Sequence, residues 1–182
     1  MAKRVLIIAE MAQSHEGSFE DECALVRAAA ASGADAVKAQ IIYADELTTP
    51  DHQHYGLFKD AELSPEQWQI LRDLAHSLGM DFLADVFGMT AAKMCVEWSI
   101  ADAYKVHASD LLNPALIEFL AGQGKRLYLS AGGIHEGELK RAIEVIRAAG
   151  NNDICLLHGF AADPTPIEES PLRRMAAMGQ RF

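Results

Sequence analysis

The 182-residue sequence lacks any apolar run near the roughly 18 residues that a membrane-spanning helix needs. Its three cysteines, Cys23, Cys95 and Cys155, form no CxxC pair, and no HExxH or comparable metal-ligand spacing occurs. The GxGxxG and GxxxxGKS/T loops of dinucleotide- and nucleotide-binding proteins are also missing. These absences argue against a membrane protein, a disulfide scaffold and a Rossmann or P-loop enzyme. They favour a cytoplasmic chain with free thiols.

Positive charge is scarce: 16 Lys and Arg face 26 Asp and Glu, which leaves a net charge of −10. Such a balance argues against broad binding to nucleic acid or to an anionic membrane. Half of the residues are hydrophobic, so the chain has enough apolar surface for a core and is not a disordered polymer.

Short apolar segments alternate with helical stretches along the whole chain, which predicts a parallel sheet. The expected strands are 4–9, 36–40, 81–85, 103–107, 126–130 and 154–158. Helix signals lie between them: Ser18 before a helix that ends near Gly33, a Ser64–Gln67 capping box before a helix that Gly79 closes, and Asn113 before a third helix. A further helix is expected over 136–150.

Polar side chains stand at the carboxyl end of nearly every expected strand, as in barrel enzymes. They are Glu10, Lys38, Gln40, Asp85, Lys105, Ser109, Ser130 and His158. We therefore predict an α/β fold of the (β/α)8 TIM-barrel type, incomplete, with about six βα units in one partial domain over 1–182. A full barrel takes about 250 residues. Residues 41–63 form the longest irregular stretch, either a substrate lid or a solvated excursion.

Two lysines at strand ends suggest a site for a small anion. Lys38 and Lys105, with the hydroxyls of Ser109 and Ser130 and the amides of the Gly132–Gly133 turn, could hold a carboxylate and a phosphate. A desolvated lysine could instead act as a Schiff-base nucleophile, or Lys38 could simply pair with Glu10 or Asp35.

Glu10 follows an apolar strand, so it is a candidate acid, base or lysine-orienting group, with a rim carboxylate as the alternative. His15 is a candidate ligand residue, although loop histidines more often have a structural hydrogen-bonding role. His107 and His158 stand at strand ends, but the histidines as a set do not have the spacing of a metal site.

Several strings together resemble the sialic acid synthase family, in the same order and over essentially the whole chain. They are Ile7–Glu10, His15–Ser18, Gly33–Gln40, Tyr104–Ser109, Leu129–Gly133 and Leu156–His158, the last followed by Pro164–Pro166. The resemblance implies a TIM barrel that condenses phosphoenolpyruvate with an N-acetylmannosamine-type aldehyde sugar to a nine-carbon 2-keto acid, with release of phosphate. It also implies help from a divalent metal, manganese or magnesium.

The resemblance implies roles for individual residues. Lys38, Lys105, Ser109 and Ser130 would hold phosphoenolpyruvate, and Glu10 would serve the acid/base or water-positioning step. We expect Glu10, Lys38 and Lys105 to be catalytic, and substrate binding from a second set: His15, Gln40, Ser109, Ser130 and His158. The family's metal ligands and its C-terminal antifreeze-like domain would lie beyond Phe182, so no metal ligands are expected in this chain.

The chain also departs from the family pattern. Ser14 stands where the family usually has Asn, and Ala39 replaces an aromatic residue. The segment Ala84-Asp85-Val86-Phe87-Gly88 stands where the family has Ser/Ala-Thr-Pro-Phe-Asp. Ala161 and Asp163 replace a phosphate-binding amide and an aromatic residue, which puts one phosphate contact in doubt.

Two other functions stay open: a Schiff-base aldolase-type barrel, and a non-catalytic binding or assembly module. Six units would leave an open sheet edge, so we expect a homodimer or higher association. The expected partners are phosphoenolpyruvate and an amino-sugar aldehyde, with neither nucleic acid nor membrane.

Overall fold

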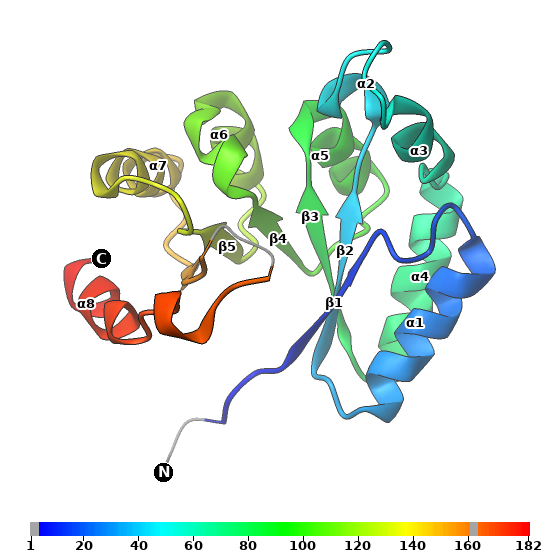
Figure 1. Ribbon diagram of the computed structural model, residues 1–182, viewed down its shortest axis with the longest axis horizontal. Helices are drawn as coiled ribbons and strands as arrows, with labels where there is room; N and C mark the ends of the chain where they lie inside the picture. The colour runs from blue at the N-terminus through cyan, green and yellow to red at the C-terminus, as the bar shows by residue number, and fades with distance from the viewer. Residues whose placement is uncertain (1–3, 161–163) are drawn as a thin grey trace. The chain divides into compact units, whose positions relative to one another are not determined.

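The computed structural model describes residues 4–160 and 164–182, and these contain six strands that alternate with helices (Figure 1). The chain divides into two compact units, residues 1–104 and 105–182, which are described separately. The first unit contains β1 Ile8–Ala12, α1 Phe19–Ala31, β2 Ala36–Ile41, α2 Ala44–Leu47, α3 Tyr55–Asp60, α4 Pro65–Ser77, β3 Asp81–Val86 and α5 Gly88–Glu97. β4, Ala103–Val106, spans the boundary between the units.

The second unit contains two further strands, with helices before, between and after them along the chain. It contains the 3-10 helix η1 Ala108–Leu112, α6 Pro114–Ala121, β5 Leu127–Ser130, α7 Glu136–Ala148, β6 Ile154–Leu157, the 3-10 helix η2 Ile167–Glu169 and α8 Arg173–Arg181. β5 and β6 pair in parallel, with Leu127 opposite Ile154 and Ser130 opposite Leu157. Each of the two strands therefore delivers its carboxyl end to the same edge.

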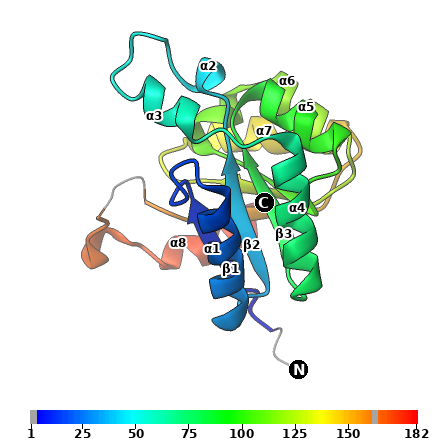
Figure 2. The same cartoon turned by 90° about the vertical axis from the view of Figure 1, so that its right-hand side faces the viewer.

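β1, β2 and β3 pair in parallel, and the register separates their two faces. Val37 lies opposite Phe82, and Trp68 of α4 packs against Phe82 with ring centroids 6.5 Å apart. This face is therefore covered by helix, and α1 lies beside α4 (Figure 2). Because side chains alternate along a strand, Lys38 and its neighbours two residues away project from the other face.

The predicted helix starts are confirmed. Ser18 accepts a hydrogen bond from the Asp21 amide, and Ser64 and Gln67 form the reciprocal capping box of α4. Asn113 caps α6 by accepting from the Leu116 amide. These polar caps satisfy amides that would otherwise lack partners at the start of each helix.

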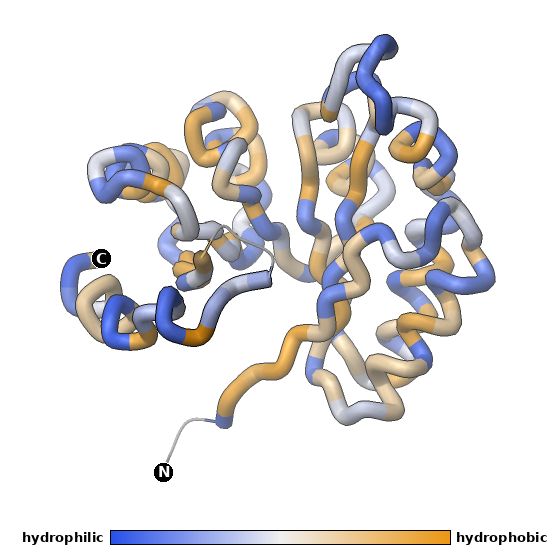
Figure 3. The backbone as a smooth tube through the Cα atoms, in the orientation of Figure 1, coloured by the Kyte–Doolittle hydropathy of each residue, from blue (hydrophilic) through white to orange (hydrophobic). Residues whose placement is uncertain are grey.

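The prediction for the first strand was wrong in its position. β1 begins at Ile8, and Val5, Leu6 and Ile7 are exposed rather than covered on both faces. Figure 3 shows this apolar stretch as a segment leading into β1. The ladder with β2 starts only where Ala36 comes opposite Ile8, so an apolar sequence alone placed the strand too early.

Residues 41–63 are not irregular throughout, since α2 and α3 lie within them. Glu46 accepts hydrogen bonds from the amide and hydroxyl of Thr90, both at 2.8 Å, and so ties α2 to the start of α5. Glu62 accepts from the Ala44 amide at 2.8 Å. Both helices are short, and tertiary bonds of this kind stabilise them without a periodic sequence pattern.

Within the described residues, no helix is long and apolar enough to cross a membrane.

Candidate functional site

The first unit gathers polar side chains on one face of its three strands. Glu10 on β1 lies opposite Lys38 on β2 in the parallel register, and Gln40 lies opposite Asp85 on β3. Lys38 and Gln40 are two residues apart, so all four side chains share the face that α1 and α4 leave uncovered. An apolar α/β layer thus supports a polar cluster on its opposite side.

Lys38 lies between two carboxylates. Its ammonium is in direct ionic contact with Glu10 Oε2, and its Nζ is 3.9 Å from Asp85 Oδ2. The pairing of Lys38 with Glu10, one of the alternatives raised by the sequence, is therefore observed. Asp35 instead accepts from the side chain of Arg4 and from the Ile7 amide.

Glu10 is held by an irregularity in β1. The register with β2 shifts between Glu10 and Ala12, which marks a β-bulge, and Ala12 has a positive φ of 51°. The Ala12 amide donates to Glu10 Oε1 at 3.1 Å. A non-glycine residue in the left-handed region is strained, and bulges commonly re-aim side chains next to functional sites.

His15 lies in the β1–α1 connection and is buried. Its Nδ1 accepts from the Gly17 amide at 3.0 Å, and its ring stands edge-on to Trp68 at 6.2 Å. Within the described residues, Nε2 has no hydrogen-bond partner. Burial lowers the pKa of His15, which favours the neutral imidazole. Substrate binding by His15 stays a prediction.

The second unit carries the remaining predicted residues. Lys105 is buried on β4, and Ser130 ends β5. Ser109 lies at the start of η1, where its hydroxyl is 3.1 Å from His107 Nδ1. Their roles, like those of Glu10, Lys38 and Gln40, stay predictions. The departures at Ala161 and Asp163 fall on residues 161–163, outside the described residues.

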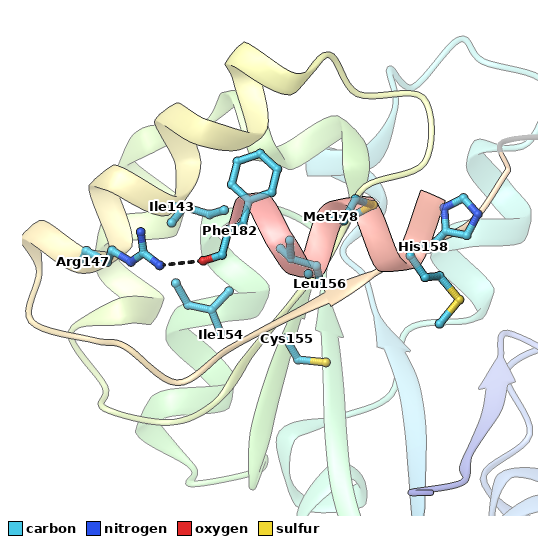
Figure 4. Close-up of a pocket in the computed structure, with 10 residues that line it drawn as sticks. Ile143, Arg147, Ile154, Cys155, Leu156, His158, Met178 and Phe182 are labelled. Carbon is cyan, nitrogen blue, oxygen red and sulfur yellow. Dashed lines mark hydrogen bonds between the residues drawn. The ribbon is translucent and has the colours of Figure 1, made fainter. Parts of the chain in front are cut away.

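His158 follows β6 and lines a cavity of about 330 Å³ between β6, α7 and α8 (Figure 4). The cavity is lined by Ile143, Arg147, Ile154, Cys155, Leu156, His158, Met175, Met178, Gly179 and Phe182. Arg147 spans one side and donates to the Phe182 carbonyl at 3.0 Å. Most of the lining is apolar, and Lys105, Ser109 and Ser130 are not among it.

Sequence reasoning noted Asp85 as a polar strand end and as a departure from a family motif, but did not assign it to the site. Its side chain is fully buried and faces Lys38. The alternation of β3 could have found it, because Phe82 and Ala84 face the helices while Asp85 falls on the opposite side with Leu83.

Comparison with known proteins identifies the family to which this chain belongs. The model of the NeuB family matches residues 25–182. The chain belongs to the NeuB family. It is 29% identical to the spore coat polysaccharide biosynthesis protein SpsE of Bacillus subtilis, over 98% of this chain and 50% of that protein. It is 27% identical to N,N'-diacetyllegionaminic acid synthase of Legionella pneumophila, over 97% of this chain and 54% of the relative.

A solved structure shows the same fold. The N-acetylneuraminic acid synthetase of Leptospira borgpetersenii superposes with a TM-score of 0.93 at 23% identity, over 99% of this chain and 62% of that chain. The predicted resemblance to sialic acid synthases and the incomplete barrel-type α/β fold are therefore confirmed. The NeuB-family chain spans about half the length of the named relatives that it matches.

Proposed function

We propose that this NeuB-family protein takes part in the condensation of phosphoenolpyruvate with an N-acetylmannosamine-type aldehyde sugar. The supporting observation is the Glu10–Lys38–Asp85 cluster on one face of β1, β2 and β3, in a chain whose relatives include an N,N'-diacetyllegionaminic acid synthase. Parallel α/β enzymes place their reacting groups at the carboxyl ends of the strands, and Gln40 and Asp85 extend this face to within one residue of those ends.

The proposed reaction forms one carbon–carbon bond and replaces the carbon–oxygen bond to phosphate with a carbon–oxygen bond to the oxygen of water. The methylene carbon of phosphoenolpyruvate attacks the aldehyde carbon, whose oxygen takes up a proton to become a hydroxyl. Water then adds to the cationic carbon that carries the phosphate and loses a proton, and the tetrahedral intermediate expels phosphate. The product is a 2-keto acid.

Each unit contributes residues to this proposal. In the first unit, Lys38 would bind an anionic group of phosphoenolpyruvate, and Glu10 would accept or return a proton in the water and aldehyde steps. In the second unit, Lys105, Ser109 and Ser130 would serve as anion ligands. Positioning the two substrates and stabilising the phosphate supply most of the catalysis in such a scheme.

A divalent metal, manganese or magnesium, remains an expectation from the family. Within the described residues, no group of three or more His, Cys, Asp or Glu side chains is arranged to hold a metal ion. These residues therefore do not fit a metal site by themselves, and no step above depends on one.

The cluster favours anion binding over the Schiff-base alternative. A lysine must lose its proton before it can attack a carbonyl group, whereas nearby carboxylates favour the ammonium form. Lys38 has one carboxylate in direct contact and a second at 3.9 Å, so its surroundings suit a permanent cation.

The test is acceptor-dependent release of phosphate from phosphoenolpyruvate, with the product followed by mass spectrometry and manganese present. We expect release only with an N-acetylmannosamine-type sugar, and its loss in Lys38→Met but not in Lys93→Met, which removes an exposed lysine on α5. A borohydride-trapped adduct on Lys38 or Lys105 would overturn the proposal in favour of an aldolase. Absence of phosphate release with every sugar tried would also count against it.

A further inference from the structure

The two carboxylates beside Lys38 differ sharply in their access to solvent. The Glu10 side chain is 45% exposed, whereas that of Asp85 is 0% exposed, and the Lys38 side chain between them is 10% exposed. Two carboxylates, one half-exposed to solvent and one buried, therefore face the same ammonium.

This difference decides which carboxylate can leave. If Asp85 separated from Lys38, a buried negative charge would lose a nearby cation without gaining water, which is costly. If Glu10 separated, water could solvate its carboxylate, and the Ala12 amide would still hold its Oε1. Removing Glu10 from the ammonium therefore costs much less than removing Asp85.

Strand geometry fixes Asp85 further. It lies in the regular ladder between β2 and β3, opposite Gln40 and on the face of Lys38. Glu10 instead precedes the bulge in β1, where the register is interrupted. A residue next to a bulge can shift with less disruption of the ladder than one inside it.

We propose that Asp85 is a positioning residue that holds the Lys38 ammonium in place, and that Glu10 is a counter-ion which an incoming anion displaces from Lys38. This inference rests on the proposed function, because it takes phosphoenolpyruvate as the anion. It assigns different tasks to the two carboxylates: Asp85 stays with Lys38, while Glu10 is released when substrate binds and becomes available for proton transfer.

The assignment predicts opposite effects from two isosteric changes that each remove one negative charge. Glu10→Gln removes the competitor of the ligand, so phosphoenolpyruvate should bind more tightly. Asp85→Asn removes the buried carboxylate that faces the flexible four-carbon side chain of Lys38 and leaves Glu10 in contact with its ammonium. The ligand must then displace the remaining carboxylate and also order the lysine, so binding should weaken.

The test is calorimetric titration of the chain with phosphoenolpyruvate. We expect affinity to rise about three- to tenfold in Glu10→Gln and to fall by a similar factor in Asp85→Asn, the range expected for a partly exposed ion pair. Turnover should fall in both variants, so that Glu10→Gln combines tighter binding with slower reaction. Asp81→Asn is the matched control, because Asp81 is exposed at the other end of β3.

The outcomes separate this inference from the proposed function. If both cluster variants bind phosphoenolpyruvate more tightly, the carboxylates act only through their charge, and the positioning role of Asp85 is overturned. The same holds if Asp81→Asn matches Asp85→Asn. Thermal unfolding of each variant shows whether the fold is retained, and Asp85→Glu, which keeps the charge, should recover part of the lost affinity. If the unaltered chain does not bind phosphoenolpyruvate, the proposed function itself fails, and this inference falls with it.

Discussion

At the scale of single residues, the chemistry of the first unit depends on charges placed where water has little access. The sequence was sufficient to select Glu10 and Lys38, because each is a charged residue in a largely apolar segment. It did not reveal that Asp85 also lies close to Lys38, because the distance between side chains on neighbouring strands depends on the register of the sheet. Nor did it show the strained Ala12, because alanine carries no sequence signal for a positive φ.

Glu22 on α1 gives a residue-scale prediction about pH. It is fully buried, neither carboxylate oxygen has a hydrogen-bond partner within the described residues, and burial raises its pKa from 4.5 to about 7. Between these two values the folded state keeps a proton that the unfolded state has lost. Stability from this group is therefore complete below about pH 4.5, declines as the pH rises, and levels off above about pH 7.

Glu22→Gln should remove the loss of stability that ionisation of Glu22 causes as the pH rises. We expect the free energy of unfolding of the variant to exceed that of the unaltered protein by on the order of 3 kcal/mol at pH 8, and to differ little from it at pH 4.5. Urea titrations of both proteins at the two pH values measure this. An equal difference at both pH values would show that ionisation of Glu22 is not the cause.

At the scale of elements, local signals predicted the helix ends better than the strand ends. Ser18, Ser64 and Asn113 each accept from an amide only three residues away, so the local sequence specifies these helix starts. The start of β1 depends on its pairing with β2, and α2 depends on Glu46 reaching Thr90. Long-range contacts of this kind have no counterpart in local sequence.

The connections before and after α1 allow a matched comparison of two glycines. Gly17 and Gly33 both have positive φ, 87° and 81°. A Cβ on Gly17 would lie 2.2 Å from the Asp60 carbonyl oxygen, whereas a Cβ on Gly33 would meet nothing within 4 Å. Gly33→Ala therefore tests backbone strain alone, and Gly17→Ala adds a clash with the backbone at the end of α3.

We expect Gly33→Ala to cost about 1 kcal/mol of unfolding free energy, and Gly17→Ala on the order of 3 kcal/mol. Chemical denaturation of both variants gives the comparison. Equal losses would mean that the segment around Asp60 moves away freely, and that the connection is not packed as described.

At the scale of the whole molecule, family membership and the position of β1 at the edge of the sheet set the expectations. The chain matches the NeuB family over residues 25–182 and spans about half the length of its named relatives. Composition and strand order were enough to predict the fold class, because βα alternation is repeated along the entire chain. The choice of sugar is not encoded in any pattern of this kind, since it depends on the shape of a complete site.

Self-association is the corresponding prediction. Within the described residues of the first unit, β1 pairs only with β2, and the exposed Val5, Leu6 and Ile7 precede it. Exposed apolar edges favour pairing between chains. Sedimentation velocity should show a dimer or larger species that Leu6→Lys weakens and Leu57→Lys, at an exposed position on α3, does not. A monomer at every concentration would contradict this.

The most direct test of the central claim is the binding of phosphoenolpyruvate to the folded chain, measured by isothermal titration calorimetry. The account predicts saturable binding that Lys38→Met reduces by at least about tenfold, equivalent to about 1.4 kcal/mol, while Lys93→Met leaves it unchanged. Lack of binding by a chain that circular dichroism shows to be folded, or equal binding by Lys38→Met, would contradict it.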